Sequence, residues 1–410
     1  MSTMTNEVQQ WESIVNPPRS RVRAAVARWL LKRIAPHVRV KVMLPDGTMV
    51  GPHDDGLPVL EILSERFFDR LGVDLKIGLG ESFMAGEWRP EPGHDLADVL
   101  TPYAERLLDI VPAWMRRFRR WVEPLHPSHE ENHKEGARSN IARHYDLSND
   151  LFKSFLDETM TYSAADFGGE RPGFQALADA QRRKIERILD YARVGPGMRI
   201  LEIGTGWGQL ALQAAQRGAF VHTITLSKEQ AALAQARIDA AGLTSQVHIE
   251  LRDYRDVEGE YDAIVSVEMI EAVGEKYWAT YFDTVSAHLK PGGWFGLQAI
   301  TMPHDRMLAS RHAYTWISKY IFPGGLIPSL EAIAEHGKDL QILDRHSLGL
   351  EYGHTLKLWR EQFARNQSAV RALGFDETFD KMWQFYLAYS EAGFRAQHLD
   401  VWQLGLQKSV

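Results

Sequence analysis

The 410-residue sequence contains no cysteine. This absence excludes a disulfide framework, a thiolate zinc site and a cysteine nucleophile. The sequence also has no uncharged apolar run that approaches the length needed to span a bilayer, roughly 20 residues. Residues 1–17 are polar and lack the apolar core of a signal peptide. We therefore expect a cytoplasmic protein that meets any lipid from the aqueous side.

Acidic residues are missing from one early segment. The net charge is −7, which argues against nucleic acid as the main partner. Residues 19–41 nevertheless contain eight Lys or Arg and no Asp or Glu. We interpret 19–35 as a basic helix with two alternative roles. It is either a solvated helix face or a contact for anionic lipid headgroups at the inner face of the membrane. In the second case Trp29, Leu30 and Leu31 enter the interface.

The length indicates more than one domain. We assign residues 1–121 to a small N-terminal α+β domain that contacts lipid, with a hairpin in 38–50 around Pro-Asp-Gly. Residues 122–138 are polar and form the predicted linker. Residues 139–410 form the second domain.

Three histidines in the predicted linker are spaced closely enough to suggest a metal site: His126, His129 and His133. The pattern places no fourth ligand, so we expect no metal.

From residue 198 onward the sequence alternates short apolar runs with helical patterns. The apolar runs are 198–204, 219–226, 247–253, 261–267 and 294–300, and a helix is predicted over 228–241. Strands that alternate with helices predict an α/β fold, in which a parallel sheet has helices on both faces.

The first of these strands ends in Leu-Glu-Ile-Gly-Thr-Gly-Trp-Gly, residues 201–208. Glycines here let the backbone turn sharply and approach a ligand. The acidic Glu202 suits the cationic head group of S-adenosylmethionine better than a pyrophosphate. The spacing of Gly204, Gly206 and Gly208 also departs from the dinucleotide pattern. The alternative is a strand-to-helix turn without a ligand.

The ends of the next two strands carry further candidates. Thr225 and Leu226 lie where a cofactor ribose usually rests, and Gln230 follows one helical turn later. Asp253 and Tyr254 end the third strand, in position to face an adenine. Each of these residues has an alternative role in helix capping.

Several segments together resemble one known family. They are "HYDLSNDLFKSFLDETMTYSAADF" (144–167), "LEIGTGWG", "TLSKEQ" (225–230), "DYRD" (253–256), "VEMIEAVG" (267–274), "KYIFPGG" (319–325) and "AGFRAQHLDVWQ" (392–403). In this order they resemble the cyclopropane-fatty-acid synthase family, and most closely its 10-methylene branch. The resemblance implies a Rossmann-like methyltransferase domain with a mostly parallel seven-stranded sheet. It also implies S-adenosylmethionine as cofactor and a phospholipid acyl substrate.

The resemblance also implies site residues. Cofactor contacts carry over to Tyr162, Ser163, Gly204, Gly206, Thr225, Leu226 and Gln230. The family's catalytic centre holds a bicarbonate ion, and its anion-binding positions correspond to Ala164, Glu271, Gln298, Ile300 and Tyr352. The family has cysteine at the position of Ala164 and histidine at the position of Gln298. Alanine lacks a side-chain donor and glutamine carries no charge, so we expect bicarbonate to be absent.

The chemistry of alkene methylation requires a base. Methyl transfer leaves a carbocation, which must be kept from water and must lose a proton. We predict that Glu271 is this base, with Tyr352 and Gln298 beside it. Glu271 follows the predicted strand 261–267, at the carboxyl edge where ligands bind in open α/β sheets. The alternative is a carboxylate that only stabilises a helix N-terminus.

Three functions remain open at this point. The favoured one is methylation of an oleoyl-like phospholipid chain to a 10-methylene product, with a separate reductase as a plausible partner. The second is a cyclopropane-fatty-acyl-phospholipid synthase. The third is an inactive lipid-binding homologue. A homo-oligomer is compatible with all three.

Overall fold

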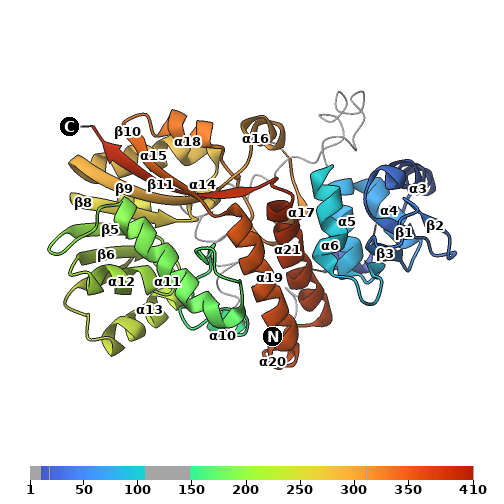
Figure 1. The fold of residues 1–410 in the computed structure, drawn as a ribbon, viewed down its shortest axis with the longest axis horizontal. Coiled ribbons are helices and arrows are strands. Elements are labelled where there is room, and N and C mark those ends of the chain that lie inside the picture. Colours follow the sequence, from blue (N-terminus) through green and yellow to red (C-terminus); the bar gives the residue numbers. More distant parts are fainter. Residues whose placement is uncertain (1–10, 18, 107–147, 312, 410) are drawn as a thin grey trace. The chain divides into compact units, whose positions relative to one another are not determined.

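The computed structural model describes residues 11–17, 19–106, 148–311 and 313–409 (Figure 1). These residues form two compact units. The first holds the described residues up to 106 together with 313–321 and 363–398, and the second holds 148–311, 322–362 and 399–409. The two C-terminal segments of the first unit fall within the predicted domain 139–410. The predicted linker and its three histidines lie outside the described residues, so the predicted boundaries stay a prediction.

The first unit contains a small mixed sheet. Its strands are β1 (Lys41–Met43), β2 (Met49–Val50), β3 (Val59–Ile62) and β4 (Trp88–Pro90), in the order β2-β1-β3-β4. Strands β1 and β2 pair antiparallel, with Val42 opposite Val50. The turn between them is closed by the bond from the Gly47 N–H to the Leu44 carbonyl, 2.9 Å. The predicted hairpin is confirmed.

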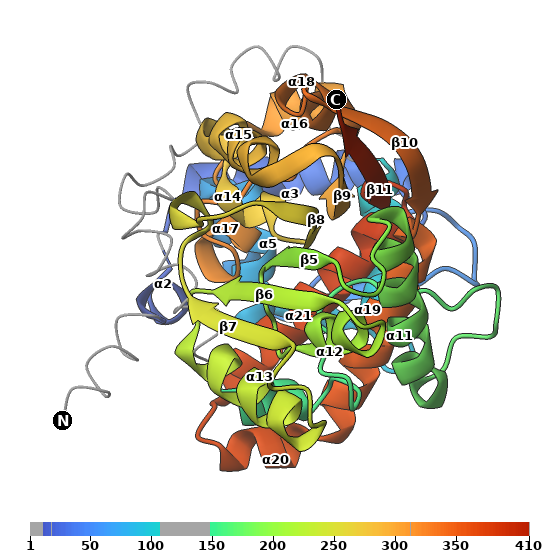
Figure 2. The same ribbon diagram turned by 90° about the vertical axis from the view of Figure 1, so that its left-hand side faces the viewer.

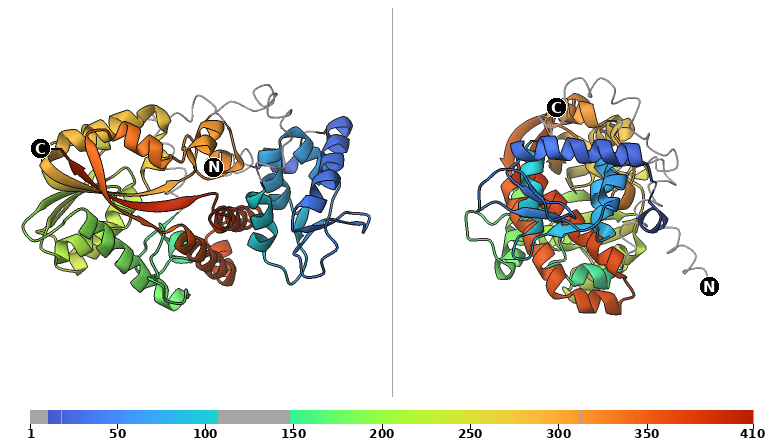
Figure 3. Two further views of the ribbon diagram at one scale, coloured as in Figure 1. Left: turned by 45° about the horizontal axis from the view of Figure 1, so that its top comes forward. Right: turned by 90° about the vertical axis from the view of Figure 1, so that its right-hand side faces the viewer.

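Helices from both ends of the chain form the rest of this unit. They are α2 (Glu12–Val15), α3 (Arg21–Ile34), α4 (Arg66–Val73), α5 (Leu75–Met84), α6 (Leu96–Glu105), α17 (Trp316–Tyr320), α20 (Gln367–Ala372) and α21 (Glu377–Arg395). Helix α21 packs along α5 and α6 (Figures 1 and 3). Ser20 caps α3, and Pro36 follows its last turn.

The second unit is built on a sheet of seven strands in the order β10-β11-β9-β8-β5-β6-β7. The strands are β5 (Arg199–Ile203), β6 (Phe220–Thr225), β7 (Val247–Leu251), β8 (Tyr261–Val267), β9 (Leu289–Thr301), β10 (Leu340–Ser347) and β11 (Asp400–Lys408). The pairs from β9 to β7 are parallel, and β11 pairs antiparallel with both β9 and β10. The predicted α/β class and the mostly parallel sheet are confirmed.

Helices cover both faces of this sheet (Figure 2). One face packs against α11 (Phe174–Tyr191), α12 (Gln209–Gln216) and α13 (Lys228–Ala240). The other packs against α14 (Ile270–Val273), α15 (Trp278–His288) and α18 (Leu330–His336). The unit also holds α10 (Asn149–Lys153), α16 (His304–Ser310) and α19 (Gly349–Arg365), whose last three residues belong to the first unit. Among the described helices, none is long and apolar enough to cross a membrane.

Candidate active site

The glycine-rich loop connects β5 to α12 and bends through left-handed backbone conformations. Gly204 has φ 99° and Gly206 has φ 50°. A Cβ on Gly204 would lie 2.8 Å from the Met269 side chain, whereas one on Gly206 would meet nothing within 4 Å. Both positions therefore favour glycine for backbone reasons, and Gly206 also borders open space.

That space is a cavity at the carboxyl edge of the sheet, which we call the loop cavity. Nine of the ten predicted cofactor residues line it: Tyr162, Ser163, Glu202, Gly204, Gly206, Thr225, Leu226, Gln230 and Tyr254. Asp253, the tenth, is buried and holds the Arg255 guanidinium at 2.7 Å. Asp253 also caps a short helical turn, as the capping alternative predicted. Ser227, next to Leu226, caps α13.

Glu202 is a buried acid at the edge of the loop cavity. Its side chain is 3% exposed, and among the described residues its Oε2 has no hydrogen-bond partner. Burial raises the pKa of Glu202 to about 8, while Thr223 and the charge of Lys184 oppose that rise. An unpartnered buried carboxylate oxygen fits a cationic amino group, so the residues present suit the amino-acid end of S-adenosylmethionine.

Lys184 is a buried residue with a basic side chain that also lines this cavity. It comes from α11, and its ammonium donates to the Ser163 Oγ at 2.6 Å. Burial lowers the pKa of Lys184 to about 8, although the negative charge of Glu268 opposes this effect. Acidic and basic side chains are therefore both buried at the cavity.

Glu268 is the most extensively bound carboxylate at the site. Its Oε1 accepts from the Ala164 main-chain N–H at 2.9 Å and from the Gln298 Nε2 at 2.8 Å. Its Oε2 accepts from the Tyr352 hydroxyl at 3.1 Å. Burial raises the pKa of Glu268, while the charge of Lys184 and these three donors lower it. Three positions that the resemblance assigns to an anion thus hold a carboxylate of the chain itself.

Glu271, the predicted base, lies three residues further along the chain, in the first turn of α14. Its Oε1 accepts from the Ile300 main-chain N–H at 2.5 Å, and its Oε2 is buried without a hydrogen-bond partner among the described residues. Burial, and then the charge of Glu268, raise its pKa to about 8. Glu271 does not line the loop cavity. Its catalytic role stays a prediction.

An aromatic cluster borders the cavity next to these acids. Tyr162 packs on Trp359 with ring centroids 5.3 Å apart, and Tyr352 meets Trp359 edge to face at 6.0 Å. The cluster continues through Phe152, whose ring contacts both Tyr162 and Trp207. Such faces stabilise a positive charge by about 0.5–2 kcal/mol each without attacking it.

Sequence reasoning missed two residues, Glu268 and Lys184. Glu268 was visible in "VEMIEAVG", as an acidic residue directly after β8. Lys184 is one of several charged residues on α11, and only its burial distinguishes it.

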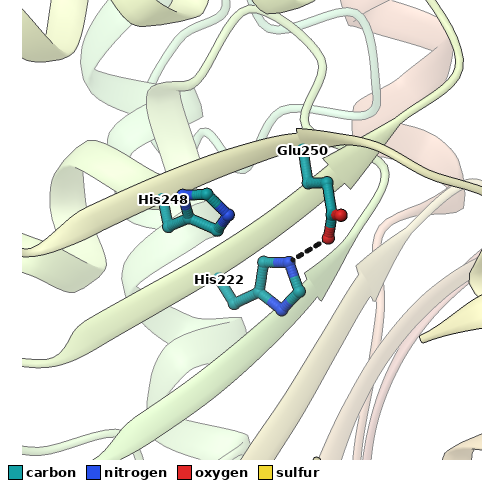
Figure 4. Close-up of side chains that lie close together, drawn as sticks. All are labelled: His222, His248 and Glu250. Carbon is teal, nitrogen blue, oxygen red and sulfur yellow. Dashed lines mark hydrogen bonds and ion pairs between the residues drawn. The ribbon is translucent and has the colours of Figure 1, made fainter. Parts of the chain in front are cut away.

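A second polar cluster lies on β6 and β7, and its three members do not line the cavity (Figure 4). His222, His248 and Glu250 approach one another with metal-ligand spacing. The ring of His222 already bonds Glu250 at 3.0 Å and the Tyr261 hydroxyl at 2.6 Å. Arg252 pairs with the other Glu250 oxygen at 2.7 Å. These bonds and the guanidinium charge account for the cluster without a cation.

The order of the seven strands, the glycine-rich loop and the buried acid Glu202 together define an S-adenosylmethionine-dependent methyltransferase. Residues 132–404 match the family model described as mycolic acid cyclopropane synthetase. The chain belongs to this family.

Curated relatives agree with that assignment. The chain is 48% identical over 405 residues to tuberculostearic acid methyltransferase UfaA1 of Mycobacterium tuberculosis, covering 96% of this chain and 94% of the relative. It is 33% identical over 366 residues to the cyclopropane-fatty-acyl-phospholipid synthase of Escherichia coli, covering 86% and 88%.

Solved structures show the same fold. The cyclopropane synthase MmaA2 of M. tuberculosis aligns with a TM-score of 0.61 and 32% identity, covering 66% of this chain and 98% of that one. The mycolic acid cyclopropane synthase CmaA1, complexed with SAH and CTAB, aligns with a TM-score of 0.61 and 29% identity, covering 69% and 99%.

Proposed function

We propose that this enzyme methylates the double bond of an oleoyl-like chain in a membrane phospholipid and releases a 10-methylene-branched product. One observation carries the proposal. Ala164, Gln298 and Tyr352 grip the carboxylate of Glu268, so the chain supplies the anion that cyclopropane-forming relatives are expected to borrow from solution. The 48% identity to a tuberculostearic acid methyltransferase supports the same branch.

S-adenosylmethionine supplies an electrophilic methyl group on a sulfonium. The residues of the loop cavity would hold it, with Glu202 opposite its ammonium and Gly206 against its methionine portion. An alkene is a weak nucleophile, so holding it in line with the methyl group supplies much of the rate.

The residues around the reacting carbon atoms must exclude water, since water would convert the carbocation to an alcohol. Ala164 and Gln298 are fully buried, and Tyr352 is 5% exposed. The rings of Tyr162 and Trp359 add aromatic surface. A dry and aromatic wall lets the cation persist long enough for a hydride shift, after which loss of a proton from the new methyl group gives a methylene.

The helix α3 supports peripheral membrane contact. Val22, Val26 and Trp29 are 76%, 52% and 57% exposed and line one side of it. Arg21, Arg23 and Lys32 are exposed beside them. The interfacial role was predicted for Trp29, Leu30 and Leu31. Leu30 and Leu31 are half-buried, so the exposed Val22 and Val26 are better placed than these leucines to enter the interface together with Trp29. An apolar stripe flanked by basic residues is typical of helices that lie in a membrane interface.

Expression in a bacterial host that lacks such enzymes tests the proposal. We expect a new acyl chain heavier by one CH₂, whose ozonolysis yields a 10-ketone. A cyclopropane of the same mass gives no ketone and would favour the synthase alternative. Unchanged lipids, together with no binding of S-adenosylhomocysteine, would favour the inactive homologue.

A further inference from the structure

We propose that Glu268 is the general base of this reaction and takes the proton from the newly transferred methyl group. This inference rests on the proposed function, because it concerns the last step of methylene formation. Glu268 lines the loop cavity, where the methyl group is delivered. Glu271 does not line it.

The contacts of Glu268 orient its carboxylate and leave it able to accept a proton. Three donors hold it from three separate segments: Ala164 before α11, Gln298 on β9 and Tyr352 on α19. None of them is an acid at neutral pH. Such donors stabilise the ionised carboxylate, and each oxygen keeps acceptor capacity for an incoming proton.

The orientation of Gln298 is itself fixed. Its Oε1 accepts from the Gln403 Nε2 at 2.9 Å, and that nitrogen also donates to the Lys184 carbonyl at 2.9 Å. Gln298 and Gln403 are fully buried. The amide nitrogen of Gln298 must therefore face Glu268, which makes it a donor to an ionised acid.

The backbone at Glu268 indicates that its side chain is needed. Its φ is 50°, in the left-handed region that favours glycine. The strained residue directly follows β8, and its N–H donates to the Gln298 carbonyl at 2.8 Å. A charged residue held in such a conformation at a ligand cavity is typical of a functional position.

The two acids share a raised pKa but differ in their place relative to the cavity. Burial, and then the charge of Glu268, raise the pKa of Glu271 to about 8. Burial raises the pKa of Glu268 as well, although the charge of Lys184 and the three donors oppose that rise. Glu268 is thus the acid of this pair that combines a place on the cavity wall with the raised basicity that a general base requires.

The step balances without another reactant. The alkene π pair forms the new C–C bond as the C–S bond breaks and S-adenosylhomocysteine leaves. The cation on the neighbouring carbon accepts a hydride from the methylated carbon, which becomes the cationic centre. The C–H pair of the new methyl group then becomes the second bond of C=CH₂, and its proton goes to a Glu268 oxygen. Glu268 returns that proton to solvent before the next turnover.

Replacement of Glu268 by glycine tests this role, because glycine relieves the positive φ and leaves Ala164, Gln298 and Tyr352 around a carboxylate-sized space. We expect Glu268→Gly to lose about 10²–10⁴-fold in kcat on dioleoylphosphatidylglycerol vesicles. Added formate or bicarbonate should restore much of that loss and leave the wild type unaffected. The isosteric Glu268→Gln should lose as much but gain nothing from either anion.

Two controls separate chemistry from folding. Calorimetry should show unchanged S-adenosylhomocysteine binding in both Glu268 variants. Gln397, in the other unit of the chain, also has a positive φ, 53°. Gln397→Gly therefore relieves the same kind of backbone strain, and this variant should keep full turnover without any anion effect.

Three outcomes would overturn the assignment: near-normal turnover of Glu268→Gln, a loss in Glu268→Gly that neither anion restores, or anion rescue of Glu271→Gly instead. The proposed function fails separately. The proposed function is contradicted if the wild type makes cyclopropane, and anion rescue of Glu268→Gly would not change that conclusion.

Discussion

Glu268 and Gln298 are joined twice, once through the main chain and once through their side chains. The Glu268 N–H donates to the Gln298 carbonyl and the Gln298 Nε2 donates to the Glu268 Oε1, each at 2.8 Å. The register of β8 and β9, in which Val267 lies opposite Gln298, brings them together. One residue of β9 therefore fixes both the strained backbone and the carboxylate of Glu268.

Gln403→Leu tests whether the orientation of Gln298 matters. The leucine removes the donor that holds the Gln298 amide, so we expect kcat to fall about tenfold, the value of one net hydrogen bond. KM and S-adenosylhomocysteine affinity should stay unchanged, which a purely structural role would not predict. Gln407→Leu, on the same strand with a long bond of 3.4 Å to Gly292, is the matched control and should be neutral.

Gly206→Val should abolish S-adenosylmethionine binding. The new side chain would enter the loop cavity and would also be strained at φ 50°. Gly242→Val carries a similar strain at φ 71°, also with open space around its Cβ, and lies in the turn after α13. Calorimetry should record binding for this control only. Equal affinities in the two variants would remove the glycine loop from the cofactor site.

We expect Glu202 to make cofactor affinity depend on pH. Its pKa in the free protein is about 8, so below pH 8 a proton competes with the ligand's ammonium. We expect affinity for S-adenosylhomocysteine to rise about tenfold from pH 6 to 7, about 1.4 kcal/mol. It should fall again above about pH 8 as the ligand amine loses its own proton.

Glu202→Gln should bind more weakly and should lose the rising limb of this pH profile. Glu335→Gln, an exposed acid on α18, is the control and should keep it. A rising limb that persists in Glu202→Gln would assign the titration to another group.

The basic face of α3 should bind anionic membranes. Changing Arg21, Arg23 and Lys32 to Gln should weaken binding to phosphatidylglycerol vesicles about tenfold or more and should reduce its salt dependence, because screening acts on exposed charges. Arg28 is left intact because it pairs with Glu65. The control changes three exposed cations of the other unit: Arg171, Lys338 and Lys357. Equal loss in both triple variants would leave only a general charge effect.

The sequence predicts the strands better than the contacts between them. Strand β8 spans residues 261–267 as expected, whereas β9 begins at Leu289, five residues before its predicted start at 294. Apolar periodicity marks the buried part of a strand, and the early residues of β9 include Lys290 and Pro291. The polar start of this strand therefore had no apolar signal.

The sequence did not predict that the C-terminal segments 313–321 and 363–398 belong to the same compact unit as the N-terminal residues. Helix α21 buries Phe385 against Phe83 and Trp88 of the first unit, yet its amphipathic pattern says only that it has a buried face. The same limit applies at the site. Glu268 and Glu271 stand three residues apart, and only the backbone at Glu268 and the register with β9 distinguish the acid that lines the cavity.

The most direct test is the product made by purified enzyme on dioleoylphosphatidylglycerol vesicles in buffer stripped of bicarbonate. Mass spectrometry after ozonolysis locates a methylene branch. We expect a 10-methylene chain at a rate that added bicarbonate does not change. Cyclopropane as the main product, or turnover that collapses without bicarbonate and returns with it, would contradict the claim that this chain supplies its own catalytic anion.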